Sequence, residues 1–167
     1  MFADKEILQI INRESLLFDD DIETHEDELK KIVSSSTFLI IGGAGSIGRQ
    51  VTKEILKRKP KTIHIIDISE NNLVELVRDL RSSNSIKSEF ETFSIDTMSK
   101  SFDLLTKNYR YDYVLNLSAI KHVRAERDPY TILRMIEVNI LSTLKSLELT
   151  KDCASCTIVK LCSFASL

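Results

Sequence analysis

A short apolar segment that runs straight into glycines limits the fold of this chain more than any other feature. Residues 37–41 (TFLII) have the continuous apolar character of a buried parallel strand, and residues 42–48 (GGAGSIG) follow directly. Ile47, Val51 and Ile55 then recur at helical spacing. The sequence therefore predicts a strand, a tight glycine turn and a helix in immediate succession.

The rest of the chain continues this alternation of strands and helices. Further strands are predicted at residues 62–66, 89–95, 113–117 and 157–161. Apolar stripes typical of helices lie between them, within residues 73–80, 102–105 and 133–147. This pattern predicts an α/β fold: a Rossmann-type, doubly wound parallel sheet of order 3-2-1-4-5 with helices on both faces. We expect the sheet to be truncated after its fifth strand, which leaves an open edge suited to self-association.

The first part of the chain, residues 1–36, is expected to form a helical, acidic N-terminal extension, and residues 37–167 the Rossmann domain. A thin apolar stripe suited to one helix is formed by Ile22, Leu29, Ile32 and Val33. Aspartates precede this stripe, and carboxylates are favoured at helix N-termini. The extension is either a docking or oligomerisation element, or a solvated helix whose charges only face water.

Composition excludes several classes of function. With 43% hydrophobic residues, 29% charged residues and a net charge of −2, the chain resembles an ordinary soluble protein without a basic surface for nucleic acid. No apolar run approaches a membrane span, and residues 1–6 lack a signal-peptide core, so a cytoplasmic location is expected. Cys153, Cys156 and Cys162 lie far in sequence from every histidine, so thiols rather than a metal site are expected.

The glycine segment carries chemistry as well as geometry. Gly43, Gly45 and Gly48 fit G-x-G-x-x-G, and a start at Gly42 instead fits the related G-x-x-G-x-x-G. Such glycines allow a tight turn, the approach of a pyrophosphate to the backbone and close packing of helix on strand. Because the segment joins a strand to a helix, it predicts a dinucleotide site rather than a purely structural turn. The predicted contacts are Gly42, Gly45, Ser46, Ile47 and Gly48.

Two acidic residues follow the next two strands. Asp67 ends the second strand about twenty residues after the glycines, where a carboxylate can accept both hydroxyls of the adenosine ribose. A negative charge there repels a 2′-phosphate, so NAD is favoured over NADP. The alternative is that Asp67 caps a helix. Asp96 follows the third strand and is expected either to contact adenine or to cap the next helix.

A second motif ends the fourth strand, at the sheet edge where ligands of such folds bind. Residues 116–123 read NLSAIKHV. Small Ser118 and Ala119 are expected to let a nicotinamide ribose approach, while Lys121 and His122 reach toward a substrate. The alternative is an ordinary basic loop.

Together these segments resemble the extended short-chain dehydrogenase/reductase superfamily. More narrowly, they are similar to the bacterial polysaccharide-biosynthesis family of UDP-N-acetylglucosamine 4,6-dehydratases and sugar-nucleotide epimerases. The resemblance covers only the amino-terminal part of such proteins, about residues 37–150 of this chain. It rests on residues 42–48, 67–73 and 116–123, and on Glu126, Pro129 and Asn139 at family-like spacing.

The resemblance implies a reaction and further site residues. The family reaction is an internal redox cycle, in which NAD(P) takes hydride from C4 of a UDP-sugar, water leaves, and the hydride returns to C6. In such a site Lys121 would contact the cofactor. The sugar nucleotide would be bound by His122, Glu126 and Asn139.

The carboxyl end departs from the family pattern. Family members continue the fifth strand into Ser-Thr-Asp-Lys and later carry a Tyr-x-x-x-Lys or Met-x-x-x-Lys pair, whereas residues 162–167 here read CSFASL. No catalytic residue is therefore predicted, and the chain is expected to be inactive by itself. The predicted function is the NAD(P)-binding portion of a nucleotide-sugar 4,6-dehydratase or epimerase. A non-catalytic remnant or a nucleotide-binding interaction module is the alternative.

Overall fold

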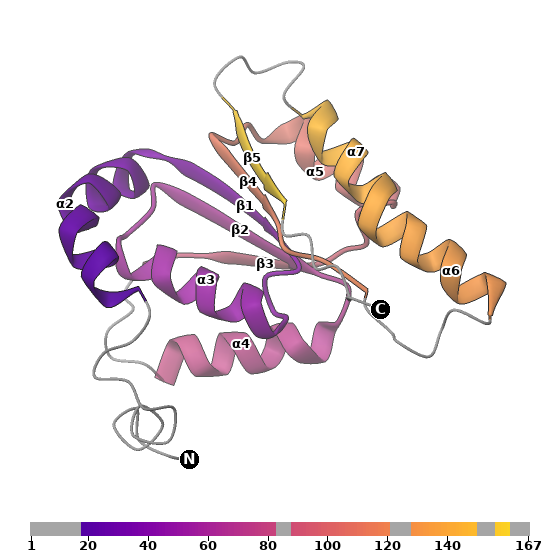
Figure 1. The fold of residues 1–167 in the computed structure, drawn as a ribbon, viewed down its shortest axis with the longest axis horizontal. Helices are drawn as coiled ribbons and strands as arrows, with labels where there is room; N and C mark the ends of the chain where they lie inside the picture. Colours follow the sequence, from indigo (N-terminus) through magenta and orange to yellow (C-terminus); the bar gives the residue numbers. More distant parts are fainter. Residues whose placement is uncertain (1–17, 83–87, 121–127, 150–155, 161–167) are drawn as a thin grey trace.

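A computed structural model describes residues 18–82, 88–120, 128–149 and 156–160, and within them the chain forms one parallel sheet (Figure 1). The strand order is β3-β2-β1-β4-β5, which confirms the predicted 3-2-1-4-5 arrangement. All four pairings are parallel. The strands are β1 (Thr37–Ile41), β2 (Thr62–Asp67), β3 (Glu91–Ser94), β4 (Tyr113–Asn116) and β5 (Thr157–Lys160).

Helices cover both faces of the sheet, as the alternating pattern predicts (Figure 1). One face carries α2 (Asp19–Ser35), α3 (Ser46–Lys57) and α4 (Glu70–Ser82). The other face carries α5 (Lys100–Asn108), α6 (Pro129–Ile136), η2 (Glu137–Leu141) and α7 (Ser142–Glu148). Each crossover returns the chain to the same end of the sheet, so the loops after the strands gather at one edge.

The central strand β1 divides the core into two layers. Phe38 and Ile40 point into the cluster under α2, α3 and α4, whereas Leu39 and Ile41 point into the cluster with α5. All four side chains are at least 96% buried, because β1 has a neighbouring strand on each side and a helical layer on each face. Burial of each such side chain stabilises the fold by roughly 1.5–3 kcal/mol.

The predicted N-terminal helix is present as α2 and contacts the domain. Three aspartates occupy its first turn, where carboxylates stabilise the positive end of a helix. Val33 near its carboxyl end is buried in the core under α3. The guanidinium of Arg58, which caps the end of α3, donates to Glu26 of α2 and to Glu54. These contacts attach α2 to the sheet, and a further role in oligomerisation stays a prediction.

A buried histidine lies on the α5 face of β2. The side chain of His64 is 1% exposed, and its Nδ1 lies 2.8 Å from the hydroxyl of Tyr111. Among the described residues its Nε2 has no hydrogen-bond partner and lies 4.0 Å from the carboxylate of Glu91. The rings of Tyr109 and Phe93 contact the imidazole edge to face. Burial lowers the pKa of His64, although the nearby charge of Glu91 opposes this effect.

The single helix predicted from the stripe at residues 133–147 forms with an irregularity. α6 continues through the π-helical turn η2 into α7, with helical dihedrals at each junction. Asp128 caps its start by accepting from the N–H groups of Tyr130 and Thr131. Just after η2, the hydroxyls of Ser142 and Thr143 donate back to carbonyls four residues earlier, within η2. Such bonds loosen a regular helix, and π-turns occur often at functional sites.

Candidate dinucleotide site

Gly42 and Gly48, at the two ends of the segment that joins β1 to α3, must be glycine for different reasons. Gly42 has φ +73°, a backbone conformation that side chains disfavour, and a Cβ there would lie 2.8 Å from the backbone of Ser118. A Cβ on Gly48 would lie 2.0 Å from the carbonyl oxygen of Gly42. The first glycine therefore lets the β4 loop approach, and the second lets α3 start directly against the turn.

Gly45 differs from these two, because its space is open. Its φ is −68°, and a Cβ there would meet only the carbonyl oxygen of Gly42, at 3.4 Å. Gly45 is the N-cap of α3, and no side chain caps this helix end in the described structure. The first N–H groups of α3 and its positive dipole end therefore form a cradle suited to an anionic group.

Asp67 connects the end of β2 to this cradle. One of its carboxylate oxygens accepts from the N–H of Ala44 at 3.2 Å and the other from the N–H of Ser69 at 3.0 Å. The hydroxyl of Ser69 accepts from the N–H of Asn72 and so caps α4. The alternative role of Asp67 as a helix cap is therefore taken by Ser69, and the carboxylate of Asp67 stays beside the glycine turn.

A cavity of about 400 Å³ opens along the carboxyl ends of the strands, from the α3 cradle to the loop after β4. This volume lies in the ordinary range for cofactor sites. Nine of the residues predicted for the cofactor line it: Gly42, Gly45, Ser46, Ile47, Gly48, Asp67, Asp96, Ser118 and Ala119. The structure thus brings together segments that are far apart in the sequence, and whether each residue contacts a cofactor stays a prediction.

The loop after β4 is held by a buried amide. The Nδ2 of Asn116 donates to the hydroxyls of Ser142 and Ser146 on α7, both at 3.2 Å. Its Oδ1 accepts from the hydroxyl of Ser118 at 2.7 Å and from the ammonium of Lys160 at 3.2 Å. Lys160 also donates to the carbonyl of Ser118. This role of Lys160 was not predicted from the sequence, where residues 157–161 were identified only as a strand.

Asn139, which was predicted to bind substrate, contacts the protein backbone instead of lining the cavity. Its Oδ1 accepts from the N–H of Ile120 at 3.0 Å, and its Nδ2 donates to the carbonyl of Ile120 at 3.0 Å. This double hydrogen bond fixes the loop after β4 against η2. A contact with substrate stays a prediction for Asn139. The other residues predicted from the resemblance, Lys121, His122 and Glu126, lie outside the described residues.

Asp96 lies at the β3 end of the cavity with both oxygens engaged. One accepts from the N–H of Met98 and the other from the guanidinium of Arg134, each at 2.9 Å. Partial burial opposes ionisation, but the Met98 N–H and Arg134 outweigh it and lower the pKa of Asp96. Ser99 rather than Asp96 caps α5, by accepting from Phe102. Sequence reasoning missed Arg134, since no spacing rule relates α6 to this loop.

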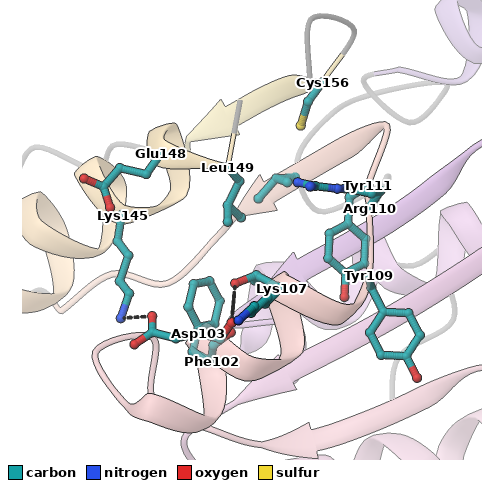
Figure 2. Close-up of a pocket in the computed structure, with 12 residues that line it drawn as sticks. Phe102, Asp103, Lys107, Tyr109, Arg110, Tyr111, Lys145, Glu148, Leu149 and Cys156 are labelled. Atoms are coloured by element: carbon teal, nitrogen blue, oxygen red, sulfur yellow. Dashed lines mark hydrogen bonds and ion pairs between the residues drawn. The ribbon is translucent and has the colours of Figure 1, made fainter. Parts of the chain in front are cut away.

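A second cavity, of about 260 Å³, lies between α5 and α7 near the amino ends of β4 and β5 (Figure 2). The side chains of Lys145 and Asp103 meet across it, with 2.6 Å between nitrogen and oxygen. The ammonium of Lys145 also lies 5.5 Å from the centre of the Phe102 ring. This cavity is at the far end of the strands from the glycine turn and shares no lining residue with the first.

Metal chemistry finds no support in the described part of the chain. There, no group of three or more histidine, cysteine, aspartate or glutamate side chains is placed to hold a metal ion. Two of the three cysteines, Cys153 and Cys162, lie outside the described residues. The expectation that they are thiols therefore stays a prediction.

The fold and the glycine cradle define a Rossmann-type domain, and the family match places it in the extended short-chain dehydrogenase/reductase superfamily. A family model described as "Polysaccharide biosynthesis protein" matches residues 38–163, and the chain belongs to this family. An uncharacterized membrane protein of Methanocaldococcus jannaschii is 32% identical over 127 residues, which make up 75% of this chain and 35% of that protein. The capsular polysaccharide biosynthesis protein CapD of Staphylococcus aureus is 27% identical over 147 residues, 87% of this chain and 24% of its own length.

Solved structures share the fold. WbmF of Bordetella bronchiseptica, in complex with NAD+ and UDP, superposes with a TM-score of 0.55 at 21% identity. The match covers 78% of this chain and 36% of WbmF. This chain therefore spans between about a quarter and just over a third of the length of these three proteins.

One relative is named a membrane protein, and this bears on where the chain resides. Across the ranges that the structure describes, no helix combines the length and apolar character needed to cross a membrane. The cytoplasmic location stays a prediction.

Proposed function

We propose that this chain is the NAD-binding portion of a nucleotide-sugar 4,6-dehydratase or epimerase of polysaccharide biosynthesis. The observation that carries the proposal is the open cradle at Gly45, next to a carboxylate at Asp67 and a cavity that ends at Ser118. WbmF, which shares the fold, binds NAD+ and UDP, and this chain's family is one of polysaccharide biosynthesis.

The residues present fit a dinucleotide in shape and charge. The backbone N–H groups at the start of α3 would hold the pyrophosphate, because no side chain fills the space at Gly45. The carboxylate of Asp67 would accept the hydroxyls of the adenosine ribose and repel a 2′-phosphate, which favours NAD over NADP. The small side chains of Ser118 and Ala119 leave room at the nicotinamide end. When bound, the nicotinamide would take and return a hydride.

The chain's own residues provide position rather than proton transfer in this proposal. Asn116 and Asn139 fix the loop after β4, so the nicotinamide end of the cavity has a defined wall. No acid–base pair was predicted from the sequence, so we expect no turnover of UDP-N-acetylglucosamine by this chain alone. A UDP-sugar is the expected substrate class of the complete protein. Self-association through the edge of β5 stays a prediction, because no contact between copies of the chain supports it.

Calorimetric titration of the full chain with NAD+ and NADP+ tests the proposal. We expect saturable binding of NAD+ and weaker binding of NADP+. Gly45→Val should weaken NAD+ binding by at least roughly tenfold, since its side chain would occupy the phosphate cradle without a backbone clash. Asp67→Asn should narrow the preference for NAD+ over NADP+, because it removes the charge and keeps an acceptor.

A control variant and two contradicting outcomes complete this experiment. Asp103→Asn alters the second cavity and serves as the matched control for Asp67→Asn, so its NAD+ affinity should equal that of the wild type. A folded chain that binds neither dinucleotide would refute the proposal and favour the non-catalytic remnant. Detection of a 4-keto sugar from UDP-N-acetylglucosamine would contradict the expected lack of turnover.

A further inference from the structure

The cavity is closed at its β3 end by an ion pair between two distant segments. Arg134 of α6 donates to Asp96, in the loop after β3, with 2.9 Å between Nη2 and Oδ2. Both residues line the cavity. The pair therefore forms part of its wall.

The guanidinium of Arg134 is held on two sides. Its Nη2 is bound by Asp96 and its Nη1 by Glu137, which lies 2.9 Å away on the next helical turn. Asp96 is itself fixed by the N–H of Met98. The side chain of Arg134 is 36% exposed, so solvent screens these pairs and their contribution to stability is small. Their main physical effect is to restrict the rotation of a planar, rigid cation.

The cavity that Arg134 lines suits a flat, uncharged aromatic group. The apolar side chains of Ile68, Ile95 and Val138 line the same cavity, and Ile68 is 62% exposed. A ligand that covers such an exposed apolar side chain removes its surface from water, which favours binding. A guanidinium plane beside apolar walls can stack on a purine base, whereas a phosphate would be repelled by the neighbouring carboxylates of Asp96 and Glu137.

We propose that Arg134 is the stacking surface for the adenine base of the bound dinucleotide, with Asp96 and Glu137 as positioning residues that hold its guanidinium. This inference rests on the proposed function. It changes the expected role of Asp96, since its carboxylate acts on adenine through Arg134. It also makes Arg134 a determinant of base specificity, because a purine offers a larger face for stacking than a pyrimidine.

The test compares two dinucleotides that differ only in the base distant from nicotinamide. NAD+ and nicotinamide cytosine dinucleotide are titrated into the full chain and its variants by calorimetry. We expect the wild type to prefer NAD+. Arg134→Leu should bind NAD+ roughly fivefold to thirtyfold more weakly and lose most of the preference. Arg134→Lys keeps the positive charge but has no planar guanidinium, so it should not restore the preference for NAD+. Arg78→Leu is the matched control and should behave as wild type, because Arg78 is an exposed residue of α4 that does not line the cavity.

Asp96→Asn supplies a second, independent arm. It should weaken NAD+ binding less than Arg134→Leu does, and it should add little further loss in the double variant, because both act through one guanidinium. Circular dichroism and thermal unfolding confirm that each variant is folded. A positioning role predicts this lack of additivity, whereas a direct contact between Asp96 and adenine predicts losses that add.

The outcomes distinguish stacking on Arg134 from the proposed NAD binding on which it rests. Equal NAD+ affinity in Arg134→Leu and wild type would overturn the inference and leave the proposed function intact. Equal weakening for both dinucleotides would assign Arg134 a merely structural role. Full recovery in Arg134→Lys would show that charge alone matters. A folded wild type that binds neither dinucleotide would overturn both statements.

Discussion

Gly48 and Gly45 lie only three residues apart, yet the structure predicts that adding a methyl group destabilises the fold at Gly48 and changes its stability little at Gly45. In Gly48→Ala the new Cβ would lie 2.0 Å from the carbonyl oxygen of Gly42 and 2.8 Å from the Cα of Gly43. Both neighbours are backbone atoms, so relief requires α3 to move away from β1. Overpacking of this kind costs up to about 3 kcal/mol.

Gly45→Ala meets none of these obstacles. Its Cβ would contact one backbone oxygen at 3.4 Å, an ordinary contact distance, and its φ of −68° suits any residue. Alanine restricts the unfolded chain, which stabilises the fold by roughly 0.4–1 kcal/mol, but it is a poorer N-cap than glycine. These effects oppose each other, so we expect the free energy of unfolding to stay within about 1 kcal/mol of the wild type.

Thermal and urea unfolding, followed by far-ultraviolet circular dichroism, measure both variants. For a chain of this size a loss of 1 kcal/mol lowers Tm by about 2–4 °C, so Gly48→Ala should lower Tm by up to roughly 6–12 °C. Gly45→Ala should unfold within about 4 °C of the wild type. Similar losses in the two variants, or a Gly48→Ala protein as stable as wild type, would refute the steric argument.

Two further predictions concern residues away from the cavity. Burial lowers the pKa of His64 in the folded state, so on acidification the imidazole is protonated in the unfolded state before it is protonated in the folded state. The free energy of unfolding should therefore fall as the pH drops below about 6.5, by at most about 1.4 kcal/mol per pH unit. His64→Phe should remove this slope in urea titrations at pH 5 to 8, and an unchanged slope would contradict the assignment. Arg58→Leu breaks the contacts with Glu26 and Glu54, so it should lower Tm by about 4 °C and speed amide exchange in α2. Exchange unchanged in α2 would show that Val33 alone holds this helix.

The sheet could be predicted from the sequence because its signals are local. Each strand is an apolar run, and the crossover rule then leaves few possible orders. The third strand was the least accurate, since Glu91–Ser94 lies at an edge and its half-exposed pattern gives weak boundaries. The cavity could be predicted for the same reason, because Gly42, Asp67 and Ser118 each lie at the carboxyl end of a strand or just after it.

The contacts that complete the site could not be predicted, because they join distant segments through polar side chains. Arg134 and Asp96 belong to different elements, and no periodicity relates a cation on a helix to a carboxylate in a loop. Lys160 lies in the predicted fifth strand, and no strand pattern relates its side chain to Asn116 in the neighbouring strand. The π-turn in η2 was also missed, since an apolar stripe of helical period does not register one additional residue.

The helix through α6 and η2 contacts the loops at both ends of the cavity. Arg134 binds the loop after β3, while Asn139 binds the loop after β4 through Ile120. The segment between Arg134 and Asn139 runs into the π-turn, Glu137–Leu141, and sets the angle between these two attachments around the helix axis. Removal of one residue there would rotate one attachment relative to the other by about 100°. The number of residues between Arg134 and Asn139 therefore determines how the two loops around the cofactor site lie relative to each other.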